Sequence, residues 1–497
     1  MLANGNERWI SARFTSNPNS VPMATDTQAP LKIKFGTDGW RAIIADAFTV
    51  TNVARVTLGV VAWLKQENKE HSVVLGHDCR FAGELFTDTI ARVLVENGIK
   101  VHLAEGFVTT PMVSFGAHKL GASLGIIITA SHNPPSYNGY KLKGGYGGPL
   151  LEDDIKAVEA LIPNEQPVDL ASVDLQAHRD SGLLVSTDLE GLYVEEVERK
   201  FDLEAIRKSG MTLAYDAMYG SGQRVLPRIL PNAKLYRCEH NPHFYGLAPE
   251  PIIRNLGGYS EFIKAEGDID LGLATDGDAD RIGLMDGDGN FVDSHHILLL
   301  LIHYLYKYKE WRGKVCCGFS SSVKVQQLCK HYGLELDVVK IGFKHICGTM
   351  LREDVLVGGE ESGGIAVKGH IPERDGIWNG LVLLEFMAKS GKTLKELVQE
   401  VYELVGAFGF HRIDLTLPEA QKLAIVEQCK SGAYTEFGPY KVQRVDTLDG
   451  FKYILSDDEW VMIRPSGTEP VLRTYAEGAS VDAAKAILAA THQVILG

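Results

Sequence analysis

Short apolar runs that alternate with longer amphipathic stretches constrain the fold of this chain more than any other feature. SVVLGHD (72–78), LGIIITAS (124–131) and LGLATD (271–276) are strand-length runs that end in small or polar residues. Between such runs lie helical patterns such as LFTDTIARVLVENGI (85–99). This alternation is typical of α/β layers around a largely parallel sheet. Because sites in such sheets lie at the carboxyl ends of the strands, those ends are where chemistry is expected.

The length of the chain and a change of pattern near its end predict how it divides into domains. At about 150 residues per domain, 497 residues correspond to three or four domains. Strands prevail from 408–413 onward, which predicts an α+β tail. The polar N-terminus has no apolar signal core, so we expect a disordered leader rather than a targeting signal, with Met23 as an alternative start. The expected segments are a leader at 1–30, domain I at 31–182, domain II at 183–296, domain III at 297–407 and domain IV at 408–497.

Composition narrows the class of protein and its partners. Hydrophobic residues make up 45% and charged residues 23% of the chain, which is the balance of a globular protein. The net charge of −14 disfavours binding to nucleic acid or to anionic membranes. The longest apolar run, near 297–302, is too short to span a bilayer. We therefore expect a soluble protein. No pair of cysteines has CxxC spacing, which favours a reducing, cytoplasmic setting. We also expect a monomer or a dimer.

The first loop whose residues could carry out chemistry follows the apolar run at 124–128 and reads Thr129-Ala-Ser-His-Asn-Pro134. A serine at a strand end beside a histidine is well placed to act as a nucleophile or a phosphate carrier. The loop lacks the G-x-S-x-G pattern of α/β hydrolases. An ordinary turn rich in Ser and Asn is the alternative interpretation.

The second loop, Thr275-Asp-Gly-Asp-Ala-Asp-Arg281, carries three carboxylates at alternate positions. Carboxylates this close in sequence can converge on one hard cation. An EF-hand is excluded, because Arg281 stands where that loop needs glycine and Gly287 where it needs glutamate. A magnesium site with open positions for phosphate oxygens fits better, and a solvated acidic turn is the alternative.

Two further loops have weaker individual signals. GGEESGG (358–364) combines flexible glycines with a carboxylate and a hydroxyl that can bind sugar hydroxyls. RPSGTEP (464–470) combines an arginine, two hydroxyls and backbone amides that can hold a phosphate. Either could be an ordinary turn. SGKT (390–393) lacks the first glycine of a Walker A loop and is interpreted as a turn between helices.

These four loops, in this order and together with FGTDGWR (35–41), resemble the α-D-phosphohexomutase superfamily. That superfamily includes phosphoglucomutase, phosphomannomutase and phosphoglucosamine mutase, and the resemblance extends from Lys32 to the C-terminus. It implies four domains around a central cleft. The first three would be α/β domains of common topology, and the last an α+β domain like the TATA-binding protein.

The resemblance also implies roles for individual residues. Ser131 matches the serine that is phosphorylated in the active enzyme, and Asp276, Asp278 and Asp280 match the ligands that hold Mg²⁺ together with the phosphoserine. The implied catalytic set is Ser131, His132, Lys141, Arg41, Arg281 and Arg374. Lys141 matches the family's candidate general base, with His132 and Arg374 as helpers. The implied substrate-binding set is Lys344, Glu360, Ser362, Arg464, Ser466, Gly467 and Thr468.

In the family's mechanism, phosphoserine donates its phosphoryl group to a hexose monophosphate. The resulting 1,6-bisphosphate turns around in the cleft and returns the other phosphoryl group to the serine. Glucose 1,6-bisphosphate is the implied activator. One departure concerns the acid/base groups: several bacterial relatives have histidine directly after the E-x-S-G tetrad, where this chain has Gly364.

The choice of sugar is the least constrained expectation. TASHNPPSYNGYK and GGEESGG look more like the glucose- and mannose-type mutases than the glucosamine type. Glucose and mannose differ at C2, whereas Glu360 and Ser362 match residues that grip O3 and O4. We expect a phosphoglucomutase, with phosphomannomutase as the alternative and phosphopentomutase as a weaker one. A non-catalytic sugar-phosphate-binding paralogue and a serine phosphatase are the alternatives from other classes.

Overall fold

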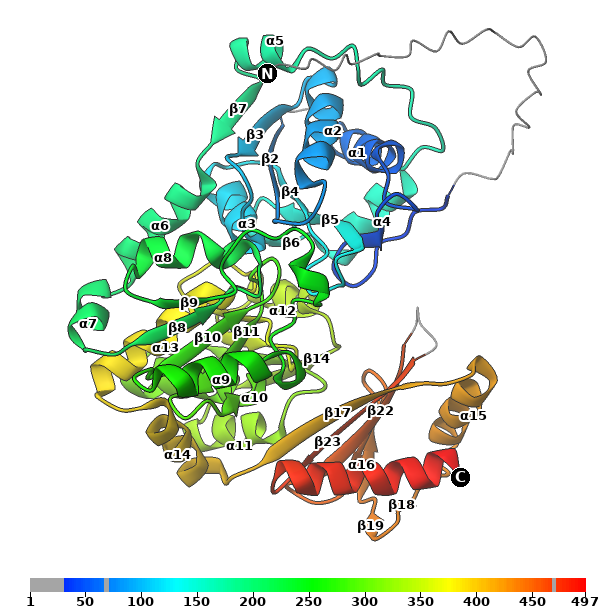
Figure 1. The fold of residues 1–497 in the computed structure, drawn as a ribbon. Coiled ribbons are helices and arrows are strands. Elements are labelled where there is room, and N and C mark those ends of the chain that lie inside the picture. The colour runs from blue at the N-terminus through cyan, green and yellow to red at the C-terminus, as the bar shows by residue number, and fades with distance from the viewer. Residues whose placement is uncertain (1–30, 67–70, 467–470) are drawn as a thin grey trace, which may run out of the picture. The chain divides into compact units, whose positions relative to one another are not determined.

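The computed structural model describes residues 31–66, 71–466 and 471–497, whose helices and strands are drawn in Figure 1. The predicted leader, 1–30, lies outside the described residues. Four main sheets follow one another along the described chain, and each is assembled from strands that are close in sequence. The predicted order of three α/β domains followed by an α+β domain is confirmed.

The first sheet has the strand order β1-β5-β4-β2-β3-β7, and β6 pairs with β5. Its bounds are β1 (Trp40–Ile43), β2 (Ser72–His77), β3 (Lys100–Ala104), β4 (Leu124–Ile128), β5 (Tyr137–Gly144), β6 (Gly148–Pro149) and β7 (Leu184–Thr187). The helices of this segment are α1 (Val50–Leu64), α2 (Gly83–Glu96), α3 (Thr110–Lys119), α4 (Glu152–Ala160) and α5 (Leu175–Asp180). The inner strands β2 and β4 are buried, as their apolar runs predict.

The second sheet has the order β12-β11-β10-β8-β9. Its bounds are β8 (Leu213–Asp216), β9 (Lys234–Tyr236), β10 (Leu271–Thr275), β11 (Ile282–Asp286) and β12 (Phe291–Val292). Its helices are α6 (Leu189–Lys200), α7 (Leu203–Lys208), α8 (Val225–Ile229) and α9 (Gly257–Glu266). Short 3₁₀ turns lie at Ser221–Gln223, Phe244–Gly246 and Ile253–Asn255.

The third sheet has the order β14-β13-β15-β16. Its bounds are β13 (Lys314–Gly318), β14 (Leu336–Val339), β15 (Val355–Gly359) and β16 (Ile365–Val367). Its helices are α10 (Ser294–His303), which continues into a π-helical turn at Tyr304–Tyr308, α11 (Val323–Tyr332), α12 (Phe343–Met350), α13 (Gly376–Ser390) and α14 (Leu394–Val405). Gly391 ends α13 and Thr393 caps α14, so SGKT is the predicted turn between helices.

The first three sheets share one arrangement of strands, although the sequence shows no repeat of fixed period. In each, three parallel strands are joined by an antiparallel fourth: β2, β3, β4 and β5; β8, β9, β10 and β11; β13, β14, β15 and β16. The fourth strand pairs with the third, so the sheets are mixed rather than largely parallel. The loop from third to fourth strand is 129–136 in the first sheet, 276–281 in the second and 360–364 in the third. Three of the four predicted chemical loops therefore occupy the same topological position.

The C-terminal sheet is antiparallel, with the order β17-β23-β22-β21-β20 and a separate β18–β19 pair. Its bounds are β17 (Gly409–Thr416), β18 (Glu436–Phe437), β19 (Tyr440–Lys441), β20 (Arg444–Asp446), β21 (Phe451–Ile454), β22 (Trp460–Pro465) and β23 (Val471–Gly478). Its helices are α15 (Glu419–Lys430) and α16 (Val481–Leu496), coloured orange and red in Figure 1.

Two predicted domain boundaries differ from the observed elements. The boundary after residue 182 falls ahead of β7, yet β7 pairs in parallel with β3, so the first sheet continues to Thr187. The boundary after residue 296 would divide α10, which begins at Ser294 because Asp293 caps it. The first boundary was placed too early because short edge strands such as β7 carry little hydrophobic signal.

The apolar core follows the same division. One buried cluster includes residues from the first three sheets and their helices, among them Val74, Leu273, Leu298 and Leu381. The C-terminal sheet has its own cluster, formed with α15 and α16. The first three domains therefore share one core, and the fourth has a core of its own. A smaller buried cluster, in which Phe319 of the third domain packs with Ile454, Trp460, Met462 and Tyr475, joins the fourth domain to the third.

Candidate active site

Ser131 lies in the loop that follows β4, and its side chain is buried. Its backbone adopts a left-handed conformation with φ of 52°, which is unfavourable for a residue other than glycine. The Ser131 hydroxyl donates a hydrogen bond of 2.7 Å to Asp276 Oδ2, in the loop that follows β10. The structure thus joins the first two predicted loops at the serine.

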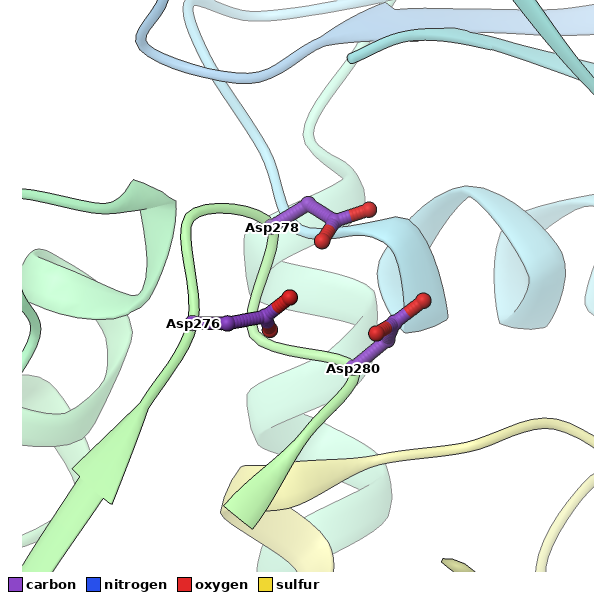
Figure 2. A group of neighbouring side chains, drawn as sticks. All are labelled: Asp276, Asp278 and Asp280. Atoms are coloured by element: carbon purple, nitrogen blue, oxygen red, sulfur yellow. The ribbon is translucent and has the colours of Figure 1, made fainter. Parts of the chain in front are cut away.

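Asp276, Asp278 and Asp280 form one buried cluster, and Figure 2 shows their carboxylates turned toward the same space. One oxygen from each lies within 4.8 Å of the others. Among the described residues, Asp278 Oδ1 and Asp280 Oδ1 have no hydrogen-bond partner. Oxygen donors that are buried, negatively charged and partly unsatisfied suit a hard divalent cation. The residues present therefore fit a magnesium ion.

Two cationic side chains from other loops lie against this cluster. Lys141, on β5, places its Nζ 2.7 Å from Asp278 Oδ2 and 3.1 Å from Asp280 Oδ2. Arg374, just before α13, lies 2.8 Å from Asp280 Oδ2 and also pairs with Asp38. Asp38 in turn lies 3.0 Å from Lys141 Nζ. The charges alternate, so each buried ion has a partner of opposite sign.

The electrostatics of the triad are uneven. Burial raises the pKa of Asp276, and the neighbouring Asp278 and Asp280 carboxylates raise it further. Burial also disfavours ionised Asp278, but the Lys141 ammonium outweighs it and holds the pKa of Asp278 below its ordinary value. Against its own burial, the same pairing raises the pKa of Lys141 and favours the ammonium form.

Arg41, His132 and Arg281 lie around the serine loop. Arg41 Nη1 donates to Asn133 Oδ1 at 2.7 Å, and His132 Nδ1 lies 3.4 Å from the Ser131 hydroxyl oxygen. Burial, reinforced by the Arg281 charge, lowers the pKa of His132 well below its ordinary value. This low pKa favours the neutral imidazole.

The third loop places Glu360 directly after β15, where it is buried. Its Oε1 accepts the Gly342 N–H at 2.8 Å, and burial raises the pKa of its carboxyl to about 6. Ser362 is half-buried in the same loop. Lys344, on α12, forms an ion pair of 2.9 Å with Glu152 at the start of α4, and no described contact joins it to the aspartate cluster.

In the C-terminal sheet, Arg464 forms an ion pair of 3.2 Å with Asp449. Asp449 also accepts the Ile341 N–H at 2.9 Å, one residue before the Gly342 turn of the third domain. Ser466 is buried, and its backbone N–H donates to Val471 O at 2.9 Å. The other predicted members of this loop, Gly467 and Thr468, lie outside the described residues.

Several residues of this network were not predicted. Asp38 stands inside the FGTDGWR segment, of which only Arg41 was singled out. Lys143 and Glu373 form a buried ion pair of 2.7 Å beside it, and Thr110 donates to Asp278 Oδ2 at 2.5 Å. Polar residues at strand and helix ends were a signal for Asp38 and Thr110. The sequence carried no comparable signal for the pairing of Lys143 with Glu373.

The chain matches four domain families in sequence order. They are the phosphoglucomutase/phosphomannomutase alpha/beta/alpha domains I (residues 32–169), II (192–289) and III (293–405) and the C-terminal domain (415–493). The chain belongs to the phosphoglucomutase/phosphomannomutase family. The resemblance to the α-D-phosphohexomutase superfamily is thereby confirmed. This phosphohexomutase is an enzyme, an isomerase that acts by intramolecular phosphotransfer.

Individual relatives carry different substrate names. The chain is 31% identical to the phosphoglucomutase/phosphomannomutase of Thermococcus kodakarensis, over 91% of this chain and 96% of that protein. It is 29% identical to a protein of Methanothermobacter thermautotrophicus named as a phosphoglucosamine mutase, over 91% and 95% of the two chains. A crystal structure named as a phosphomannomutase, from Thermus thermophilus, is 33% identical, with a TM-score of 0.82 over 94% and 100%. Membership of the family therefore does not select the sugar.

No helix in the described part of this phosphohexomutase is long and apolar enough to cross a bilayer.

Proposed function

We propose that this phosphohexomutase interconverts glucose 1-phosphate and glucose 6-phosphate through a phosphorylated Ser131 and a hexose 1,6-bisphosphate. The observation that carries the proposal is the Ser131 hydroxyl, buried and hydrogen bonded to an acidic cluster that fits a cation. A hydroxyl in such a place can be phosphorylated only where positive charge offsets the phosphate. Lys141 and Arg374 pair with the cluster, and the Arg281 guanidinium, paired with Glu250, also acts on Asp276.

Asp276, Asp278 and Asp280, with the phosphorylated Ser131, would hold Mg²⁺. The ion would neutralise charge on the phosphoryl group and fix its orientation. The surrounding cations position the group further, which matters because phosphoryl transfer is catalysed mainly by positioning and charge stabilisation.

The proposed cycle has two half-reactions. In the first, the bond from phosphorus to Ser131 Oγ breaks while a new bond forms to the free hydroxyl oxygen of the hexose monophosphate. The hydroxyl proton leaves through a nearby basic group, and Ser131 ends as a hydroxyl. In the second, the turned bisphosphate returns its other phosphoryl group to Ser131 and takes a proton back. Lys141 is the candidate proton carrier, with His132 and Arg374 as helpers. The carboxylates around Lys141 favour its ammonium form, which suits it to give a proton, whereas the low pKa of His132, 3.4 Å from the serine oxygen, suits it to take one.

We assign substrate binding to the third and fourth loops. Glu360 and Ser362 would accept and donate hydrogen bonds to sugar hydroxyls, and Lys344 would approach from α12. Arg464 and Ser466, with Gly467 and Thr468, would hold the phosphate that is not transferred. What supports this division is that Glu360 follows β15 at the position that Ser131 and Asp276 occupy in their own sheets.

Mannose 1-phosphate is the alternative substrate, because a grip on O3 and O4 does not distinguish C2. Glucosamine 1-phosphate is a second candidate, since relatives of 29% and 28% identity are named as phosphoglucosamine mutases. Glucose 1,6-bisphosphate is the proposed activator. A cytoplasmic location and a monomeric or dimeric state stay predictions.

The test is an isomerisation assay with glucose, mannose and glucosamine 1-phosphates side by side, in Mg²⁺ with a trace of the matching bisphosphate. We expect the highest kcat/KM for the glucose substrate. Ser131→Ala should lose at least about a thousandfold in kcat, because no acceptor oxygen remains. Ser136→Ala, in the same loop, is the matched control. A higher kcat/KM for glucosamine 1-phosphate would overturn the sugar assignment, and full activity of Ser131→Ala would overturn the mechanism.

A further inference from the structure

A second buried ion pair lies behind the serine loop, in the segment that follows β2. Asp78 and Arg80 have no exposed side-chain surface, and Arg80 Nε lies 3.3 Å from Asp78 Oδ2. Neither residue belongs to the aspartate cluster or to the substrate-binding loops. A buried ion pair needs a reason beyond stability, because desolvation offsets most of its Coulomb energy.

The guanidinium of Arg80 donates hydrogen bonds to backbone carbonyl oxygens of the serine loop. Nη2 donates to Ser131 O and Asn133 O at 2.6 Å each. Nη1 donates to Pro134 O at 2.9 Å and to Tyr137 O at 3.2 Å. The loop from Ser131 to Tyr137 is therefore wrapped around one cationic side chain, whose two terminal nitrogens meet four carbonyls.

Asp78 holds the other side of the same serine. Its Oδ2 accepts the Thr129 hydroxyl at 2.5 Å, and that hydroxyl oxygen accepts the Ser131 backbone N–H at 2.9 Å. Its Oδ1 accepts the Arg80 backbone N–H at 2.8 Å, which ties the two residues together. Asp78 thus reaches the serine through Thr129.

The two contacts together determine where the serine side chain points. The Ser131 N–H belongs to the peptide group before its Cα, and the Ser131 carbonyl to the peptide group after it. Holding both groups fixes φ and ψ, and therefore the direction of the Cα–Cβ bond. The observed φ of 52° is unfavourable for serine. These hydrogen bonds offset the free-energy cost of that conformation, which the loop would otherwise leave.

We infer that Asp78 and Arg80 are positioning residues, which lock Ser131 in its left-handed conformation so that its hydroxyl faces Asp276. This inference rests on the proposed role of Ser131 as the phosphoryl carrier. Phosphoryl transfer tolerates little misalignment, and a displacement of about 1 Å can lower a rate by about a hundredfold. The pair therefore acts on turnover without touching the substrate.

The experiment compares Arg80→Met with Arg92→Met in the full-length protein. Arg92 is the matched control, because it also donates to two backbone carbonyls of the first domain, Leu170 O and Val173 O, and pairs with Asp88. Hydrogen–deuterium exchange of the peptide that spans 129–137 reports on the loop, and kcat and KM for glucose 1-phosphate report on catalysis. Melting temperatures report on overall folding.

We expect Arg80→Met to speed exchange in 129–137 at least about tenfold and to lower kcat about a hundredfold, with KM within about threefold of wild type. Arg80→Lys should recover part of kcat, because an ammonium can meet some of the carbonyls. Arg92→Met should change neither the exchange of that peptide nor kcat. Unchanged exchange and kcat in a folded Arg80→Met protein would overturn the inference, as would equal losses in Arg92→Met.

Thr129→Val keeps the test decisive if Arg80→Met does not fold. It removes only the hydroxyl between Asp78 and the Ser131 N–H, and we expect about a tenfold loss of kcat with normal melting. Wild-type kcat in Thr129→Val would contradict the part of the inference that runs from Asp78 through Thr129 to the Ser131 N–H. The exchange measurement needs no substrate, so it tests whether Asp78 and Arg80 hold the serine loop even if the assays overturn the proposed mutase reaction. Faster exchange without any effect on kcat would show a structural role only, which would overturn the positioning role.

Discussion

The charges around Ser131 and those of the C-terminal sheet are held in contrasting ways. Lys141 and Asp278 have no exposed side-chain surface, and Lys141 shares Asp280 with Arg374, so the network joins the first three domains. Arg464 and Asp449 of the C-terminal sheet are about one-fifth exposed, at 19% and 21%. The first group lies in domains that share one core, whereas the second lies in a domain with its own core, which meets the third domain through one smaller buried cluster.

This difference suggests a division of labour. A transfer centre that must align phosphorus with two oxygens gains from loops fixed by buried ion pairs. A grip on the distal phosphate must release a bisphosphate that turns around, so it gains from a domain that meets the others through a smaller buried cluster than the core the first three domains share. The chain passes between the two regions at Gly406, whose φ of 79° ends α14 before Phe408 packs against His296.

Apart from the loss of Ser131 itself, the largest effect is expected in the transfer centre, from Asp278→Asn. Removing one carboxylate from the triad should lower kcat by roughly a hundredfold or more and weaken Mg²⁺ binding at least about tenfold. Kinetics over a Mg²⁺ titration, together with calorimetry of Mg²⁺ binding, measure both. Asp288→Asn, on an exposed turn of the same sheet, should change neither. Normal turnover of Asp278→Asn at low Mg²⁺ would contradict the metal assignment.

A smaller effect is expected from Gly364→Ala, which tests how tightly the network is packed. A Cβ at this position would lie 2.5 Å from Arg374 Cδ, so the arginine must move away from Asp280. We expect kcat to fall about tenfold, because a partner of the buried carboxylate is displaced. Gly257→Ala, where an added Cβ meets no atom within 4 Å, is the control for the substitution itself. Equal kcat in both variants would show that Arg374 has room to spare.

In the C-terminal sheet, Arg464→Met should act on binding rather than on turnover. Loss of a guanidinium that would hold the distal phosphate should raise KM about tenfold and leave kcat within about threefold. Steady-state kinetics with glucose 1-phosphate separate the two constants. Arg444→Met, exposed on β20 of the same sheet, is the control. A fall in kcat with unchanged KM would break the proposed division between the two regions.

The smallest effect is expected at the link between the two regions, from Asp458→Asn. Asp458 pairs with Lys324 of α11 at 2.5 Å but is 57% exposed. Solvent screens the Asp458 carboxylate, and the Lys324 ammonium, at 4% exposure, keeps Gln327 Oε1 as a partner. The loss should therefore cost no more than about 1 kcal/mol of unfolding free energy. We expect a melting temperature within a few degrees of wild type and unchanged kcat. A large fall in activity would show that the orientation of the fourth domain depends on this single contact.

The candidate loops could be predicted because their chemistry is local. Apolar runs followed by SHN, DGDADR or EES identified buried strands with polar carboxyl ends, and β4, β10 and β15 lie there. The turn at SGKT between α13 and α14 could be predicted for the same reason, because Gly391 and Thr393 end and begin helices through contacts with their neighbours. Periodicity and turn chemistry act over a few residues, so one sequence is enough to locate them.

The tertiary structure alone decided which of those loops meet and what surrounds them. Asp38 and Arg374 are separated by more than 330 residues yet form an ion pair, and Arg80 reaches the serine loop from the end of a neighbouring strand. No local pattern marks such partners, because any buried charge can be paired by any segment that the fold brings within reach. The repeated strand order of the first three domains is also not visible in the sequence. Many apolar sequences satisfy one packing arrangement, so the arrangement can recur where the sequence does not.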